Sequence, residues 1–167
     1  MAGSSNPAAM TRSICLLVLV FAIAASAQQT AHHAGVVSRG DHVMGFSHEN
    51  TVHHFYLTKN GGIIEALASS CADTKSRKEI HRHFEHIATM FANGDFNAPM
   101  LIHNRVPPGV PVMKKLRMQI SYQLQDEPAG SRIVISSENA KAVNAIHDFL
   151  RFQIRDHQTG DSIAIMN

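Results

Sequence analysis

Histidines and methionines gather in one part of this chain, at spacings that could bind a metal ion. The chain has twelve histidines, and the segments HRHFEHIATM (81–90) and PMLIH (99–103) combine several of them with methionines. In a helix, His83, His86 and Met90 follow one another at intervals of three and four residues, so they lie on one flank. Imidazole suits copper and zinc, and thioether sulfur selects Cu(I). The spacing therefore predicts a transition-metal site, with copper ahead of zinc.

Two histidines on one helix would not hold a metal tightly, so further ligands must come from other segments. We expect His103 to be the third ligand. His53 and His54 are neighbours on a predicted strand, so they point to opposite faces and only one of them can face the helices. That one is the expected fourth ligand. The predicted metal ligands are His83, His86, His103, His54, Met90 and Met100. Two alternatives stay open: a solvated helix flank that binds nothing, or a catalytic or pH-sensing use of the histidines.

A second group of polar residues lies on the last predicted helix. Gln153 and His157 fall where the matching helix of the first half has apolar residues, and burying them is costly unless they are bonded or used. They indicate either a polar pocket between the halves, with His157 as acid, base or ligand, or an ordinary helix end. His147 matches His81, which favours packing or hydrogen bonding near the sheet. The residues of this second possible pocket are His53, His147, Gln153 and His157.

The elements that must position these side chains form a repeated strand–strand–helix unit. Apolar patterns predict strands over 53–58, 63–69, 118–125 and 132–137, and helices over about 73–92 and 139–157. The two helices align without a gap, which places Asp73 on Asn139 and Ile80 on Ile146. The repeat halves are about 53–93 and 118–158. The expected fold is α+β, with an antiparallel sheet of four or more strands and two helices packed on one face.

The repeat lies within a single α+β domain over 42–167. A proline-rich linker, 96–112, is expected to connect the halves over the surface. Its length is unusual inside one domain unless it binds something. The stretch VMGFS (43–47) is a candidate edge strand, and residues 28–41 read as a flexible lead.

Residues 1–27 are typical of an export signal. Arg12 precedes an apolar run from Ile14 to Ala25 that is too short to span a bilayer, and Ala25-Ser26-Ala27 is a cleavage sequence. We therefore expect a periplasmic or secreted protein with no stable membrane anchor after cleavage. Cys15 leaves with the signal, so Cys71 has no partner within the chain, and a buried position is the expected one.

Composition and motifs exclude several function classes. The signal holds one of the fifteen Lys and Arg residues, which leaves fourteen against thirteen Asp and Glu. This near-neutral balance gives no electrostatic basis for nucleic-acid binding. The chain has no nucleophile elbow, no His-Glu-x-x-His zinc motif, no phosphate-binding loop and no Rossmann fingerprint, so no nucleotide cofactor is expected.

Several segments together resemble a family of small exported bacterial proteins with no established activity. They are MGFSHENTVHHF (44–55), HIATMFANGDFNAPMLIH (86–103), PPGVPVMKKL (107–116) and HDFLRFQIRDHQTGD (147–161). The resemblance implies histidines near positions 83, 86 and 103 and transfers no function. Some relatives carry the label aspartate carbamoyltransferase. This sequence does not support that label, because it has no carbamoyl-phosphate loop and is about half the length needed.

Three function hypotheses follow from the residues. The first is sequestration or delivery of a transition metal. The second is a non-catalytic binding module for a small molecule or a protein, which could form a homodimer, with a pocket between sheet and linker and histidines as pH-sensitive contacts. The third is a small metal-dependent hydrolase, which needs an open coordination position for water.

Overall fold

The computed structural model describes residues 28–166, so the predicted signal over 1–27 lies outside the described residues. The chain divides into two compact units, residues 1–35 and residues 36–167. Residues 28–44 are helical, and of these residues 36–44 belong to the second unit. Residues 28–41, expected to form a flexible lead, are thus part of a helix. Neither this helix nor any other in the described part is both long and apolar enough to cross a membrane.

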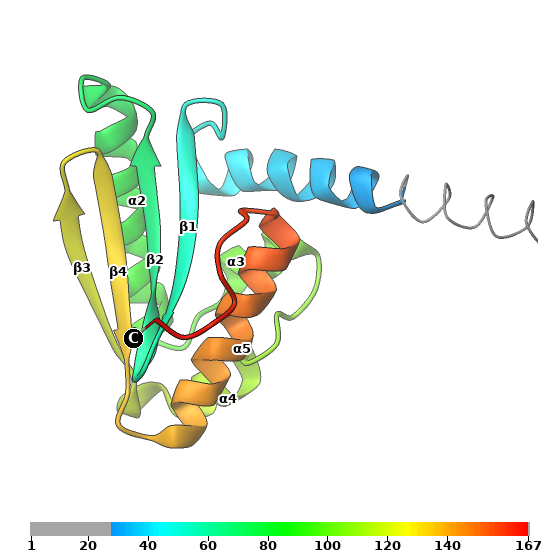
Figure 1. Cartoon of the computed structure of the whole chain (residues 1–167), viewed down its shortest axis with the longest axis vertical. Coiled ribbons are helices and arrows are strands. Elements are labelled where there is room, and N and C mark those ends of the chain that lie inside the picture. The colour runs from blue at the N-terminus through cyan, green and yellow to red at the C-terminus, as the bar shows by residue number, and fades with distance from the viewer. Residues whose placement is uncertain (1–27, 167) are drawn as a thin grey trace, which may run out of the picture. The chain divides into compact units, whose positions relative to one another are not determined.

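The sheet of the second unit has four antiparallel strands (Figure 1). They are β1 (Thr51–Thr58), β2 (Gly61–Ala68), β3 (Ser121–Glu127) and β4 (Gly130–Ser136). The order is β1-β2-β4-β3, so each predicted hairpin forms and the two hairpins meet through their second strands. The predicted α+β class and the antiparallel sheet are confirmed.

Glycines allow the two central strands to approach. Gly61 begins β2 and Gly130 begins β4. A Cβ on Gly61 would lie 2.0 Å from the Ile135 carbonyl oxygen, and one on Gly130 would lie 2.0 Å from that of Ala66. The sequence separation from Gly61 to Gly130 equals that from Ala66 to Ile135. The same close contact therefore occurs once in each direction between the two central strands.

Each hairpin is followed by a long helix, α2 (Thr74–Ala92) and α5 (Ala140–His157). Side-chain oxygens cap both starts: Asp73 accepts from the backbone N–H of Ser76, and Asn139 accepts from that of Lys141. These caps match the predicted helix starts. The buried face of α2 includes Ile80, Phe84, Ile87 and Phe91, which follow one another at intervals of three and four residues and so form one apolar stripe.

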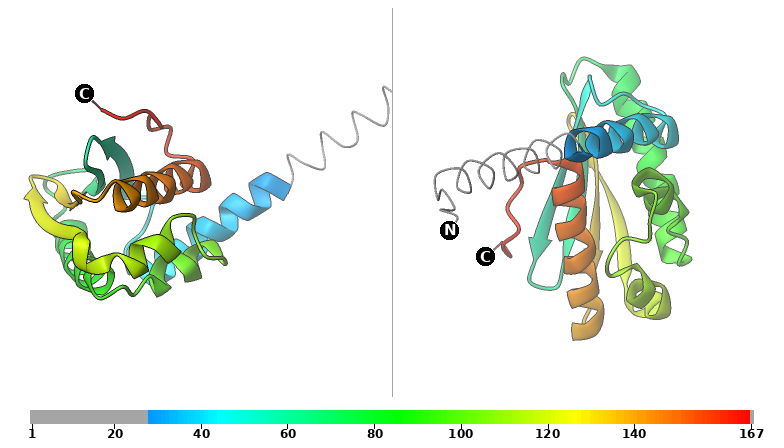
Figure 2. Two further views of the ribbon diagram at one scale, coloured as in Figure 1. Left: turned by 90° about the horizontal axis from the view of Figure 1, so that it is seen from below. Right: turned by 90° about the vertical axis from the view of Figure 1, so that its right-hand side faces the viewer.

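Both long helices pack on the same face of the sheet (Figure 2). Helix α2 contacts mainly β4 and β3, whereas α5 contacts β1 and β2. Each helix therefore covers strands of the opposite half. A single core results, filled by side chains such as Leu57, Ile133, Ile146, Phe149 and Leu150.

The segment between the halves is helical and partly buried, in contrast to the predicted surface linker over 96–112. It forms α3 (Asn97–His103), α4 (Val110–Lys115) and the short helix η1 (Arg117–Gln119). Ile102, His103, Val110 and Met113 are all buried. Proline did not prevent these helices, because Pro111 lies in the first turn of α4, where a missing N–H costs little.

Two smaller predictions from the sequence differ from the structure. The proposed edge strand over 43–47 does not form, because the helix runs to residue 44 and a bend follows. Cys71 is exposed, in the turn between β2 and α2, and is not buried as expected. The free edge of β1 is met by the C-terminal tail, where the Met166 N–H donates to the Leu57 carbonyl at 2.8 Å.

Candidate functional site

A cavity of about 70 Å³ lies between the helix-covered face of the sheet and the helices α2, α3 and α5. We call it the histidine cavity, because His53, His83 and His157 line it together with Met44 and Gln153. The rest of its wall is mainly apolar, formed by side chains of the strands, α2, α3 and α5. It therefore combines an apolar interior with a few polar groups, as ligand sites of small proteins usually do.

His53 reaches the cavity because it shares a face of β1 with the core residues Phe55 and Leu57. Its ring stacks on Phe46, with centroids 5.7 Å apart. Burial lowers the pKa of His53 to about 4, and the neighbouring His54 adds to the effect. At neutral pH the imidazole is therefore uncharged.

His83 comes to the same place from α2. Its ring meets the edge of Phe46, with centroids 5.6 Å apart, so this phenylalanine contacts both histidines. Burial lowers the pKa of His83 to about 4, helped by His53 and His86. The cavity thus has two neutral imidazoles, each with one N–H donor and one acceptor nitrogen.

His157 is the last residue of α5 and completes the group. Its ring lies 6.3 Å from that of His53 and 5.7 Å from that of Phe55, centroid to centroid. On its other side the ring of His103 approaches at 5.0 Å, nearly perpendicular. His157 therefore connects the cavity to the buried polar network behind it.

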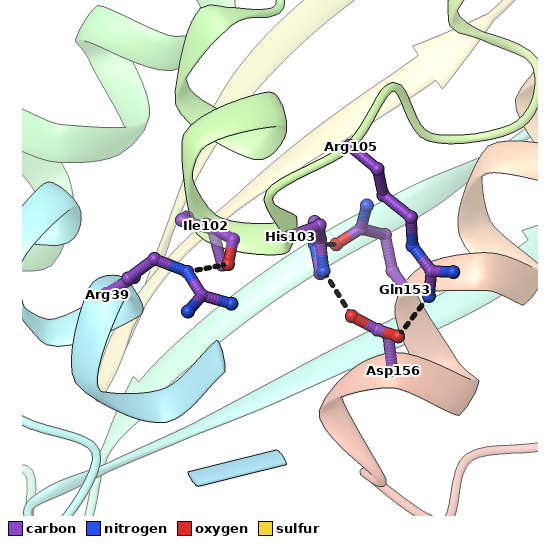
Figure 3. A network of polar contacts seen from close by, with 6 residues as sticks. All are labelled: Arg39, Ile102, His103, Arg105, Gln153 and Asp156. Carbon is purple, nitrogen blue, oxygen red and sulfur yellow. Dashed lines mark hydrogen bonds and ion pairs between the residues drawn. The ribbon is translucent and has the colours of Figure 1, made fainter. Parts of the chain in front are cut away.

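That network is centred on His103, which is only 1 % exposed (Figure 3). Its Nδ1 lies 2.6 Å from Asp156 Oδ2, and its Nε2 lies 2.9 Å from Gln153 Oε1, so both ring nitrogens are at hydrogen-bond distance from an oxygen. The second oxygen of Asp156 accepts from Arg105 at 2.7 Å. Burial lowers the pKa of His103, although the hydrogen bonds to Asp156 and Gln153 act in the opposite direction. Both ring nitrogens face oxygen atoms of the protein, so neither is directed at a metal ion.

Gln153 belongs to both the network and the cavity. Its side chain is 4 % exposed and lines the cavity while Oε1 faces His103. Within the described part of the chain, its Nε2 is buried without a hydrogen-bond partner. Such a group costs about 1–3 kcal/mol unless something satisfies it.

The remaining predicted residues lie elsewhere. His54 faces away from His53, and its Nδ1 contacts Asp161 Oδ1 at 2.9 Å. His147 is buried, and its Nε2 donates to the Thr58 carbonyl at 2.9 Å, which is the predicted hydrogen bond near the sheet. His86 is exposed, while Met90 and Met100 are half-buried.

The predicted metal ligands are not brought together. Among the described residues, no three His, Cys, Asp or Glu side chains lie close enough to hold a metal ion. His83 lines the cavity, but His103 is held by Asp156 and Gln153, and His54 is on the other face of the sheet. The structure instead groups His83 with His53 and His157, two residues of the second predicted pocket.

Several contributors to the site were absent from the sequence prediction. Met44 and Phe46 lie at the end of the segment taken for an edge strand, and Arg105 lies in the linker. Asp156 directly precedes His157 and is bonded to both His103 and Arg105. Its role could have been inferred from its position three residues after Gln153, one turn along the same helix.

Comparisons with protein-family models, with curated proteins and with solved structures find no match to this chain. The resemblance to a family of exported bacterial proteins therefore stays a prediction.

Proposed function

We propose that this protein is a non-catalytic binding module that takes a small, uncharged and largely apolar ligand in the histidine cavity. The observation that carries the proposal is the cavity itself, an apolar space entered by two neutral imidazoles and a buried amide. Export to the periplasm or the medium, expected from the signal-like N-terminal segment, is part of the same proposal.

The size of the cavity limits what it can enclose. An apolar cavity of about 150 Å³ can bind benzene, so a cavity of about 70 Å³ can enclose only part of such a ring. The cavity is open to solvent on one side. A small ring or the end of a short chain could therefore enter while the rest of the ligand stays at the opening.

The protonation states of His53 and His83 favour an uncharged ligand. With pKa values of about 4, His53 and His83 carry no positive charge at neutral pH and would give an anion no ion pair. No carboxylate lines the cavity within the described residues, so a cationic ligand would also lack a counter-charge. The imidazoles can still donate or accept single hydrogen bonds.

The proposal is tested by titrating the protein with cyclopentane and following backbone and methyl NMR signals. We expect saturable shifts confined to residues that line the cavity. Ala98→Leu adds volume at a buried residue of the cavity wall and should weaken binding at least tenfold. Ala72→Leu, at an exposed turn, is the matched control and should have no effect. Equal binding by both variants would refute the proposal.

Transition-metal binding is the second candidate, on a different residue set from the sequence prediction. His53, His83 and Met44 line one cavity, and both imidazoles are in the neutral form that a metal requires. Copper suits such a His/Met mixture better than zinc. Elemental analysis after copper or zinc loading and desalting tests this candidate. About one metal per chain, lost in His53→Ala plus His83→Ala and retained in His86→Ala, would support it over the small-molecule proposal.

A further inference from the structure

The amide of Gln153 is the one deeply buried polar side chain that forms part of the wall of the histidine cavity among the described residues. Its oxygen faces His103 Nε2, and its nitrogen has no protein partner there. The contact with His103 accounts for the amide oxygen, because an apolar side chain here would leave His103 Nε2 buried without that partner. It does not account for the amide nitrogen, which is buried without a partner among the described residues and therefore points to a group outside the protein.

The network behind Gln153 holds this amide in place. Asp156 fixes the His103 ring by a 2.6 Å hydrogen bond, and Arg105 holds the other carboxylate oxygen at 2.7 Å. The Arg105 guanidinium also lies 4.7 Å from the centre of the Phe152 ring. Because His103 is itself buried, its contact with the amide is not exchanged with solvent. One end of the amide is thus occupied, and the other remains available to a ligand.

We infer that the ligand of the histidine cavity carries a hydroxyl or carbonyl oxygen that hydrogen-bonds to the side-chain amide of Gln153. The inference rests on the proposed function and adds the chemical class of the ligand: a small alcohol, ketone or related neutral oxygen compound with an apolar body. A hydroxyl suits the site best, because it can accept from the amide nitrogen and donate to a neutral imidazole.

Charged oxygen compounds fit less well. A carboxylate or phosphate would enter an apolar space whose two characterised imidazoles are uncharged at neutral pH. The cost of removing an anion from water far exceeds what one amide hydrogen bond returns. The single oxygen of a neutral ligand needs only one hydrogen-bond donor, and the amide nitrogen of Gln153 can be that donor.

The experiment compares cyclopentanol with cyclopentane, two rings that differ by one hydroxyl. Dissociation constants are measured by NMR for the wild-type protein, for Gln153→Met and for the control Gln123→Met, whose side chain is exposed on β3. We expect the preference for cyclopentanol, expressed as the ratio of the two constants, to fall about three- to tenfold in Gln153→Met. It should be unchanged in Gln123→Met.

A second measurement covers the case in which Gln153→Met does not fold. In the wild-type protein, the side-chain amide signals of Gln153 should shift with cyclopentanol and much less with cyclopentane. If cyclopentane binds but the preference and the amide signals do not respond to the hydroxyl, this inference fails and the proposed function stands. If neither compound binds, the proposed function fails as well.

Discussion

Replacing Asp156 by alanine tests whether the network around His103 is an energetic support of the fold. His103 is 1 % exposed and Asp156 is 9 % exposed, so their hydrogen bond is shielded from water. The substitution leaves His103 Nδ1 buried without its hydrogen-bond partner, and a lost hydrogen bond to a charged group costs about 1.5–3 kcal/mol. The Arg105 side chain is 53 % exposed, so its ion pair with Asp156 adds at most about 1 kcal/mol. We expect a total loss of about 2–4 kcal/mol.

The assay is equilibrium unfolding in urea. For a domain of this size a loss of about 3 kcal/mol lowers the midpoint by roughly 1–2 M. Asp148→Ala is the matched control on the same helix, because the Asp148 side chain is 62 % exposed and lies 4.0 Å from Arg151. It should change stability by no more than about 0.5 kcal/mol. Equal urea midpoints for Asp156→Ala and Asp148→Ala would refute the reasoning. If Arg105→Ala loses as much stability as Asp156→Ala, the ion pair with Arg105 and not the contact with His103 supplies the stabilisation.

Three further predictions concern other parts of the molecule. His53 and His83 have pKa values lowered from 6.5 to about 4, so between these pH values the folded state binds fewer protons than the unfolded state. The free energy of unfolding should therefore fall as the pH drops from about 6.5 to 4, by up to about 3 kcal/mol per histidine. Urea unfolding at several pH values measures this loss, and a His53→Phe variant whose pH dependence is as steep as that of the wild type would contradict it. Gly130→Ala should destabilise the protein by more than about 2 kcal/mol or prevent folding, because its Cβ would overlap the Ala66 carbonyl oxygen. Thermal unfolding followed by circular dichroism measures this effect, and a much smaller loss of stability would show that the strands can adjust. Exposed Cys71 should react completely with a thiol reagent in the native protein, and slow reaction limited by unfolding would show that the thiol is protected.

The sequence predicts the repeated unit well because its signals are local. Helix caps such as Asp73 and Asn139 depend on residues within one turn, and period-two patterns identify the strands. The helices of the segment between the halves are harder to predict from the sequence, because they are short and α3 begins without a side-chain cap. Burial of residues such as Ile102 and Val110 against other elements stabilises them, and that contact is not visible in a local pattern.

The candidate site shows the same limit. Spacing along α2 correctly indicates that His83 shares a flank with His86, but it cannot show that only His83 reaches the cavity while His86 stays exposed. The helix-facing side of β1 is decided by the core residues Phe55 and Leu57, which place His53 inward and His54 outward. The partnership of His103 with Asp156 joins residues that lie far apart in the sequence, and no spacing rule anticipates it.

The exchange of helices between the halves has a consequence for folding. Since α2 packs mainly on β3 and β4 and only in part on β2, while α5 packs on β1 and β2, the helix of each half covers mainly strands of the other half. A polypeptide cut within the connecting segment would give two fragments, each with a sheet face that is buried mainly by the helix of the other fragment. Such fragments should remain unfolded apart and recover the native structure when mixed. Folding of the intact chain must therefore wait until both halves have been synthesised.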